Sequence, residues 1–203
     1  MSDGIYKEIV SSSFGKYKIK GSKFISYAYP VHSEKEIKDI IENIKRIESS
    51  ARHHCYAYVL GAEKSIRVFN DDGEPYSSAG KPILGQILSK DLTNILIIVN
   101  RYFGGIKLGI SGLINAYRSA SIDAIINADF IIKVVKDYYE VNFQYQQIND
   151  VMRIVKKSNL EIINTNFEIK CKLIFAVEKQ KSNLILNAFK DKHKLKIKYL
   201  KTL

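Results

Sequence analysis

Three clusters of polar residues carry the side-chain types that acid–base, metal or anion chemistry requires. The first is ARHHCYAY, where His53 and His54 stand at the start of an expected strand. Successive side chains of a strand face opposite ways, so we expect one histidine to be packed or hydrogen-bonded inside and the other to be exposed. The pair lacks the i, i+4 helical spacing of a zinc protease motif. Cys55 follows directly, but adjacency on a strand does not bring a base onto a thiol, so we expect a small buried side chain there.

The second cluster is NDDGEPYSSAGKP, which contains the three carboxylates Asp71, Asp72 and Glu74. Carboxylates near histidines can hold a divalent cation or act as a general base. The alternative is ordinary turn chemistry, in which Asp71 and Asp72 accept hydrogen bonds from local backbone amides. The cluster ends in a Gly-Lys pair, but Pro82 follows Lys81 where a P-loop needs a hydroxyl, and the glycine spacing is wrong. A P-loop is therefore excluded.

The third cluster, VNRYFGGIKLGISG, is typical of a strand that runs through a glycine-rich turn into a helix. Gly104, Gly105 and Gly109 allow the backbone to turn tightly and to approach a partner closely. Backbone amides at the helix start, beside Arg101 and Lys107, suit a phosphate or a carboxylate. The spacing does not match GxGxxG, so a dinucleotide fingerprint is not met.

Two aromatic residues, Tyr102 and Phe103, follow Arg101 directly. Aromatic faces beside positive charge are typical of sites where single-stranded bases stack. We expect Phe103 to belong to the core, and Arg101 to lie close to the glycine turn with its guanidinium available to a bound anion. A buried Arg101 fully paired to a carboxylate would instead be structural, and its removal would destabilise the protein.

The elements that must position these clusters alternate between strands and helices. Ser33 is expected to begin a helix, because Glu36 three residues later completes a capping-box pattern and isoleucines follow at helical spacing. Further helices are expected around residues 82–88 and 113–125, and strands at residues 24–31, 54–60, 65–69 and 95–99.

The last part of the chain has the pattern of a separate small module. Tyr139, Val141, Phe143 and Tyr145 alternate with polar residues, which predicts a half-buried strand. Two helices and three more strands are expected after it. The order βαββαβ is that of a ferredoxin-like fold, so we predict an α+β protein with domains at residues 1–133 and 134–203.

The net charge of +11 is unevenly placed, because residues 136–203 contain 14 Lys and Arg against 7 Asp and Glu. Such an excess favours a polyanionic partner such as RNA, although solubility alone also accounts for it. Four lysines near the end alternate along the expected last strand: Lys192, Lys194, Lys196 and Lys198. They either follow a nucleic-acid backbone or protect a sheet edge from self-association.

The remaining composition bounds the class of protein. The longest aliphatic run, 95–99, is far shorter than the roughly 20 residues that span a bilayer. Neither a secretion signal nor a cysteine framework is present, since Cys55 and Cys171 are the only cysteines. We therefore expect a cytoplasmic protein with no membrane partner, no cofactor and no metal.

The three clusters, in this order, resemble the signature segments of the YigZ/IMPACT family over about residues 16–128. The resemblance implies a first domain with the α/β fold of the second domain of a small-subunit ribosomal protein. It also implies a ferredoxin-like second domain similar to one in elongation factor G. Eukaryotic relatives regulate translation. The residues that the resemblance carries over are Arg52, His53, His54, Asp71, Asp72, Glu74, Pro75, Gly80, Pro82, Arg101, Gly104, Gly105 and Gly109.

Three functions are compatible with these residues. The first is a non-catalytic RNA- or ribosome-associated regulator of translation, which binds a ligand through Arg52, Lys81, Lys107 and the other residues of the three clusters. The second is a hydrolase that acts on small molecules or depends on a metal ion. Its candidate catalytic residues are His53, His54, Asp71, Asp72 and Glu74. The third is a module that binds a translation-associated protein. No convincing nucleophile or closed ligand set is present, so the sequence favours binding over catalysis.

Overall fold

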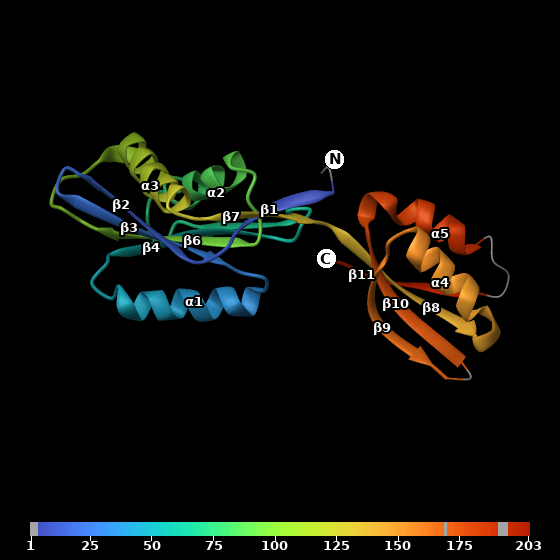
Figure 1. The fold of residues 1–203 in the computed structure, drawn as a ribbon. Helices are drawn as coiled ribbons and strands as arrows, with labels where there is room; N and C mark the ends of the chain where they lie inside the picture. The colour runs from blue at the N-terminus through green and yellow to red at the C-terminus, as the bar shows by residue number, and fades with distance from the viewer. Residues whose placement is uncertain (1–3, 169, 191–194) are drawn as a thin grey trace. The chain divides into compact units, whose positions relative to one another are not determined.

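The computed structural model describes residues 4–168, 170–190 and 195–203. Its internal contacts divide the chain into two compact units, Tyr6–Lys133 and a unit built on Val134–Leu203 that also includes Gly4 and Ile5. Each unit packs helices against an antiparallel sheet (Figure 1), which confirms the predicted α+β class.

The first unit is built on a five-stranded antiparallel sheet with the order β2-β3-β6-β4-β5. The strands are β2 (Ser13–Ile19), β3 (Ser22–Pro30), β4 (His53–Leu60), β5 (Ile66–Asn70) and β6 (Ile95–Tyr102). The central strand β6 is buried from Ile95 to Arg101 because helices cover both faces of the sheet. That two-sided burial explains its uninterrupted apolar run, ILIIV.

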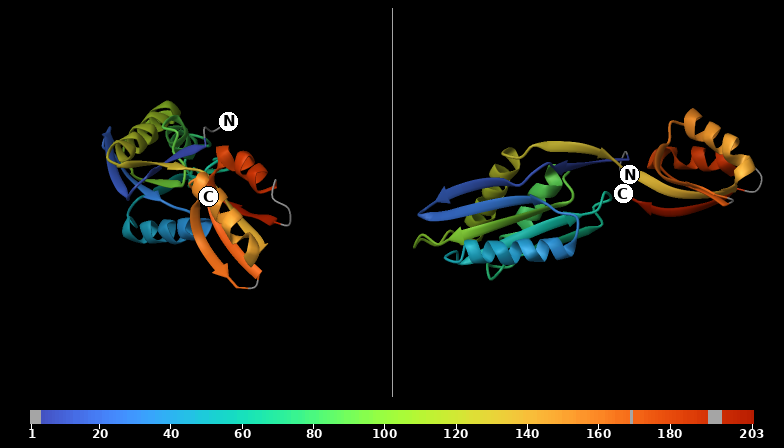
Figure 2. Two further views of the ribbon diagram at one scale, coloured as in Figure 1. Left: turned by 45° about the vertical axis from the view of Figure 1, so that its right-hand side comes forward. Right: turned by 60° about the horizontal axis from the view of Figure 1, so that its bottom comes forward.

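Helix α1 (Glu34–Ile47) covers one face of this sheet, while α2 (Gly80–Ser89) and α3 (Gly109–Ile126) cover the other, as the views in Figures 1 and 2 show. The predicted start of α1 is confirmed, because the Ser33 hydroxyl accepts a hydrogen bond from the Glu36 amide at 3.2 Å. Ile37 and Ile44 then bury the apolar stripe of α1 against the sheet.

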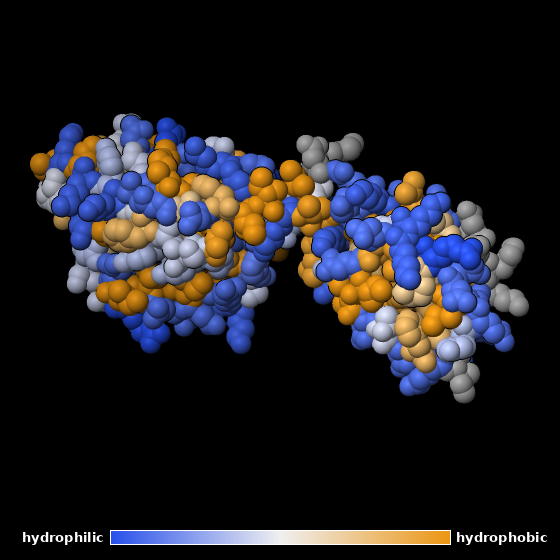
Figure 3. Space-filling view, viewed as in Figure 1, coloured by the Kyte–Doolittle hydropathy of each residue, from blue (hydrophilic) through white to orange (hydrophobic). Residues whose placement is uncertain are grey.

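Two short strands, β1 (Ile5–Ile9) and β7 (Phe130–Val134), form a separate two-stranded sheet that the sequence did not reveal. Ile9 is buried in the core of the first unit, but the other large apolar side chains of this sheet, from Ile5 and from Phe130 to Val134, are 41–65% exposed. Apolar residues gather over these strands in Figure 3. Gly4 and Val135 extend the pairing, since the Val135 amide donates to the Gly4 carbonyl at 2.7 Å.

The second unit has the order β8 (Lys136–Gln144), α4 (Ile148–Lys157), β9 (Glu161–Phe167), β10 (Lys170–Glu178), α5 (Ser182–Lys190) and β11 (Lys196–Thr202). Short 3-10 turns at Tyr145–Gln147 and Lys179–Lys181 lead into the two helices. The sheet order is β11-β8-β10-β9 and all pairs are antiparallel, which confirms the ferredoxin-like prediction.

The pairing of β11 with β8 completes one edge of this sheet. Lys136 and Leu203 exchange both backbone hydrogen bonds, at 2.7 and 2.9 Å. Tyr145 was expected to continue β8, but it begins the 3-10 turn and is exposed. No helix in the described part of the chain is long and apolar enough to cross a membrane.

Candidate functional site

A cavity of about 310 Å³ opens in the first unit, where the end of β6, the loop after β5 and the start of α3 meet. This cavity is lined by six of the residues that the sequence predicted to bind a ligand: Arg52, His53, Glu74, Arg101, Lys107 and Gly109. Its remaining wall is mostly apolar and consists of Pro75, Phe103, Leu108, Ile110 and Leu113. The fold therefore brings members of all three sequence clusters to one place.

Glu74 is the centre of the polar side of this cavity. Its Oε1 accepts hydrogen bonds from Nη1 of Arg101 at 2.6 Å and from the hydroxyl of Tyr117 at 2.8 Å. Only 3% of the Glu74 side chain is exposed. Tyr117 falls within the helix expected around residues 113–125, but nothing in the sequence indicated that its hydroxyl would reach this carboxylate.

The expectation for Arg101 needs correction. The residue does lie beside the glycine turn and lines the cavity, but its side chain is only 8% exposed and Nη1 is committed to Glu74. The guanidinium also lies 5.7 Å from the ring of Phe24 and 5.5 Å from that of Phe103. Its Nε is buried and has no hydrogen-bond acceptor among the residues that the structure describes.

The two histidines face opposite sides of the sheet, as expected for neighbours on a strand. The expectation that one of them would be exposed is wrong, because their side chains are only 15% and 12% exposed. Nδ1 of His53 donates to the Asp72 carbonyl at 2.7 Å, and its Nε2 lies 3.9 Å from Oε1 of Glu74. The His54 ring lies on the side of α1 and donates from Nε2 to the Glu48 carbonyl at 3.1 Å. Only His53 therefore belongs to the cavity.

Asp71 and Asp72 accept hydrogen bonds from backbone amides and do not line the cavity. The Asp71 carboxylate accepts from the amides of Ser77, Ala79 and Gly80 at 2.8–3.0 Å, which caps the start of α2. Asp72 accepts from the His54 amide at 2.6 Å. The turn interpretation is therefore correct for Asp71, whereas Asp72 binds an amide of β4, 18 residues away in sequence. No three His, Cys, Asp or Glu residues of the described chain are placed to hold a metal ion.

The glycines of the third cluster serve different purposes. A Cβ on Gly104 would lie 1.9 Å from the carbonyl carbon of Gly21, so this glycine permits a close approach of two backbones. Gly105 and Gly109 have positive φ angles of 84° and 71°. Gly109 lines the cavity, whereas Gly104, Gly105 and the exposed Lys81 do not.

Phe103 is not a core residue, contrary to expectation. Its side chain is 41% exposed, and the guanidinium groups of Arg52 and Arg101 lie 5.9 and 5.5 Å from its ring. Cys55, by contrast, is fully buried as expected. Burial raises the pKa of its thiol, so Cys55 is not an activated nucleophile.

The second unit presents a different surface, which we call the lysine face. The register of β10, β8 and β11 places five exposed lysines on the side of the sheet that the helices leave open: Lys170, Lys172, Lys196, Lys198 and Lys201. On these three strands, the cross-strand rows that contain the lysines include one described carboxylate, Glu140 of β8. It pairs with Lys172 at 2.7 Å. Lys192 and Lys194 lie outside the described residues.

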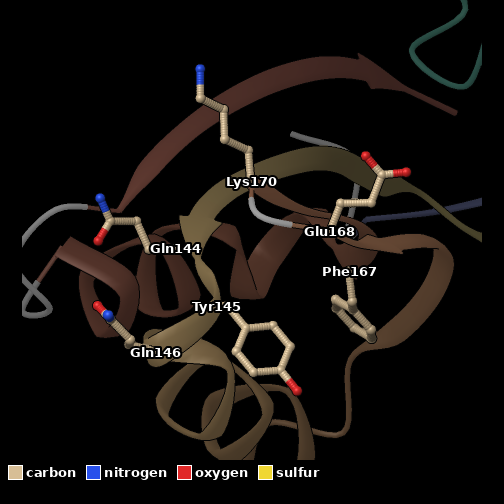
Figure 4. A pocket seen from close by; sticks show the side chains of 6 residues that line it. All are labelled: Gln144, Tyr145, Gln146, Phe167, Glu168 and Lys170. Carbon is tan, nitrogen blue, oxygen red and sulfur yellow. The ribbon is translucent and has the colours of Figure 1, made fainter.

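A second cavity, of about 550 Å³, adjoins one end of this face. Its lining is Gln144, Tyr145, Gln146, Phe167, Glu168 and Lys170, all labelled in Figure 4. Tyr145 is 62% exposed and Phe167 is 41% exposed. Figure 4 shows their two rings on the same side of the view, with the Lys170 side chain extending away from them.

Comparison with known proteins identifies the family. The family model described as the Impact N-terminal domain matches residues 20–125. The chain belongs to the IMPACT family. An IMPACT family member of Haemophilus influenzae is 34% identical over 164 residues and 80% of each chain, and YigZ of Escherichia coli is 32% identical over 74% of each.

The similarity extends to the second unit. A crystal structure described as that of a hypothetical protein is 27% identical to this chain, covers 98% of both chains and gives a TM-score of 0.71. YvyE of Bacillus subtilis, another IMPACT family member, is 30% identical over 81% of this chain and 76% of its own. The family resemblance of the three sequence clusters is therefore confirmed.

Proposed function

We propose that this IMPACT family chain is a non-catalytic RNA- or ribosome-associated protein that regulates translation. The observation that carries the proposal is the lysine face, where five exposed lysines share four cross-strand rows of β10, β8 and β11 with one glutamate, Glu140. The next row on this side pairs Glu178 of β10 with Lys136 of β8. The outer strand β9 adds Asn164 and Asn166 to the same face, and its Glu161 pairs with Lys136 at 2.5 Å. The face is therefore a positive surface suited to a polyanion.

The spacing of the lysines suits an extended chain of phosphates. Lys196 and Lys198 are two residues apart on β11, which is roughly 6.6–6.8 Å along a strand. Lys172 lies in the same cross-strand row as Lys196, with β8 between them. Each lysine that neutralises a phosphate releases a counterion, which makes the affinity depend on salt.

Aromatic side chains on and beside the lysine face favour single-stranded RNA as the polyanion. The Lys201 amino group lies 5.2 Å from the centre of the Tyr138 ring on this face. Tyr145 and Phe167 are exposed at the adjoining cavity, whose lining also includes Lys170. Bases of any sequence can stack on such rings, at about 1–3 kcal/mol each.

Family membership supports the link to translation, because eukaryotic members of the family regulate it. The hydrolase alternative has less support, since His54, Asp71 and Asp72 lie outside the cavity and the Cys55 thiol is buried.

The proposal is tested by the salt dependence of RNA binding. Fluorescence anisotropy with a labelled single-stranded RNA would compare the natural chain with the variant Lys170→Gln/Lys172→Gln/Lys196→Gln/Lys198→Gln. Loss of four phosphate contacts should reduce the log–log salt slope by about 2.8 for a single strand. The matched control replaces four exposed lysines of the first unit, Lys35, Lys38, Lys81 and Lys90, by glutamine.

The outcomes separate the interpretations. An unchanged slope in the lysine-face variant, or an equal loss in the control, would contradict the proposal. Self-association of the variant with no change in RNA binding would show that the lysines protect the edge strand β11. Binding to a translation-associated protein without affinity for RNA would favour the protein-binding alternative.

A further inference from the structure

We propose that the cavity at the start of α3 binds a small organic oxyanion, that is, a carboxylate or a phosphate ester on a compact apolar body. The proposal is independent of the RNA proposal, because the cavity is lined by residues of the first unit and the lysine face belongs to the second.

The charge of the lining favours an anion. Arg52, Lys107 and Arg101 contribute three cations against the single carboxylate of Glu74, which already pairs with Arg101. Arg52 and Lys107 are both exposed, and their positive charges are not offset by Glu74. The cavity therefore keeps a positive excess after its internal ion pair is counted.

The start of α3 adds to this attraction. The helix has 18 residues, its N-cap residue Leu108 offers no side-chain hydrogen bond, and its first turn contains no acidic residue. The backbone amides at such a start carry partial positive charge and lack partners within the helix. Leu108, Gly109 and Ile110 line the cavity, so this helix start borders the space that a ligand would fill.

A buried donor at the same place gives independent evidence for a ligand. The Arg101 side chain is more than nine-tenths buried and lines the cavity, yet its Nε–H has no acceptor among the described residues. Buried polar groups in native proteins are nearly always hydrogen-bonded, so an orphaned one needs an explanation. An oxyanion that draws the Arg101 side chain towards the cavity would give this N–H an acceptor.

The rest of the lining defines the body of the ligand. Phe103, Ile110 and Leu113 present apolar surface, and Phe103 and Ile110 are 41% and 62% exposed. A volume of about 310 Å³ is at the small end of the range for ligand cavities. A single ring with one anionic group fits both the volume and the lining.

The test uses the whole chain and three simple probes at fixed ionic strength: phenyl phosphate, benzoate and phenol. Binding is followed by calorimetry and by ligand-observed NMR. We expect phenyl phosphate, benzoate or both to bind at least ten-fold more tightly than neutral phenol. The relative affinity of the first two tells a phosphate site from a carboxylate site. Equal binding of phenol would overturn the proposal, as would no oxyanion binding at roughly 10 mM, where a Kd of about 1 mM would nearly saturate the site.

Variants locate the binding. Arg52→Gln/Lys107→Gln should weaken the oxyanion at least ten-fold and leave phenol unchanged. The control Lys81→Gln/Lys90→Gln removes the same charge from exposed positions at the two ends of α2, outside the cavity lining, and should have no effect. An equal loss in the control would assign the binding to the general positive charge and would refute the site. The lysine face is unaltered in both variants, so the result does not depend on RNA binding.

Discussion

Replacement of Arg101 by alanine gives the sharpest test of how the first unit is held together. The substitution removes the cation from a pair in which the Arg101 and Glu74 side chains are 8% and 3% exposed. Glu74 would keep the hydrogen bond from Tyr117 but would remain a buried carboxylate without a counter-charge. Removing one member of a buried pair costs about 3–5 kcal/mol. That is a large share of the roughly 5–15 kcal/mol that stabilises a typical domain.

Urea denaturation followed by far-UV circular dichroism measures this cost. With a slope of about 2 kcal/mol/M, the midpoint of the transition of the first unit should fall by roughly 1.5–2.5 M. Arg52→Ala is the matched control, because Arg52 lines the same cavity but is exposed, and it should change stability by less than about 0.5 kcal/mol. The double variant Arg101→Met/Glu74→Leu should recover much of the loss, since an apolar pair leaves no charge buried.

The reasoning fails if Arg101→Ala moves the midpoint no further than Arg52→Ala. The guanidinium would then be effectively solvated, and its pair with Glu74 would contribute little to the stability of the first unit. A double variant less stable than Arg101→Ala would also contradict the argument, because it would place the cost in packing against the Phe24 and Phe103 rings.

Two further predictions concern the glycine turn and a tyrosine. Gly104→Ala should destabilise the protein by more than about 2 kcal/mol, because the new Cβ would meet backbone atoms of the β2–β3 turn. Gly105→Ala should cost about 1–2 kcal/mol through its positive φ alone, and Gly85→Ala, in open space on α2, should stabilise by about 0.5–1 kcal/mol. Thermal unfolding of the three variants checks this order. A hydrogen bond to Glu48 raises the pKa of Tyr102 to about 12, so its contribution to stability is present below pH about 10 and is lost as the pH rises through about 12. Absorbance at alkaline pH should show that Glu48→Gln lowers this pKa, and an unchanged titration would contradict the assignment.

Local patterns predicted most of the elements. The N-cap of α1 and its isoleucine stripe involve neighbours in sequence, so periodicity and capping rules suffice. The alternation of β8 likewise showed which residues enter the core of the second unit. The strands β1, β2 and β7 were missed because short segments such as SFGKYKI owe their structure to partners far along the chain.

The composition of the cavity was only partly predictable, for a related reason. The residue types of the motifs predicted the three clusters that contribute to the cavity. The strand register determines which residues of each cluster lie together in it. His53 is the cross-strand partner of Arg101, and this register turns His53 and not His54 towards Glu74. Asp71 was a plausible ligand by residue type, yet three local amides occupy its carboxylate.

The exchange of hydrogen bonds between Lys136 and Leu203 has a consequence for biosynthesis. β8 is made early in its unit, and its partner β11, which begins sixty residues later, is the last strand. At roughly 5–20 residues per second, one side of β8 stays without its neighbour for several seconds after β8 is translated. The nascent second unit is thus an incomplete sheet with an open strand for that time, and during it chaperones or neighbouring nascent chains have access to β8.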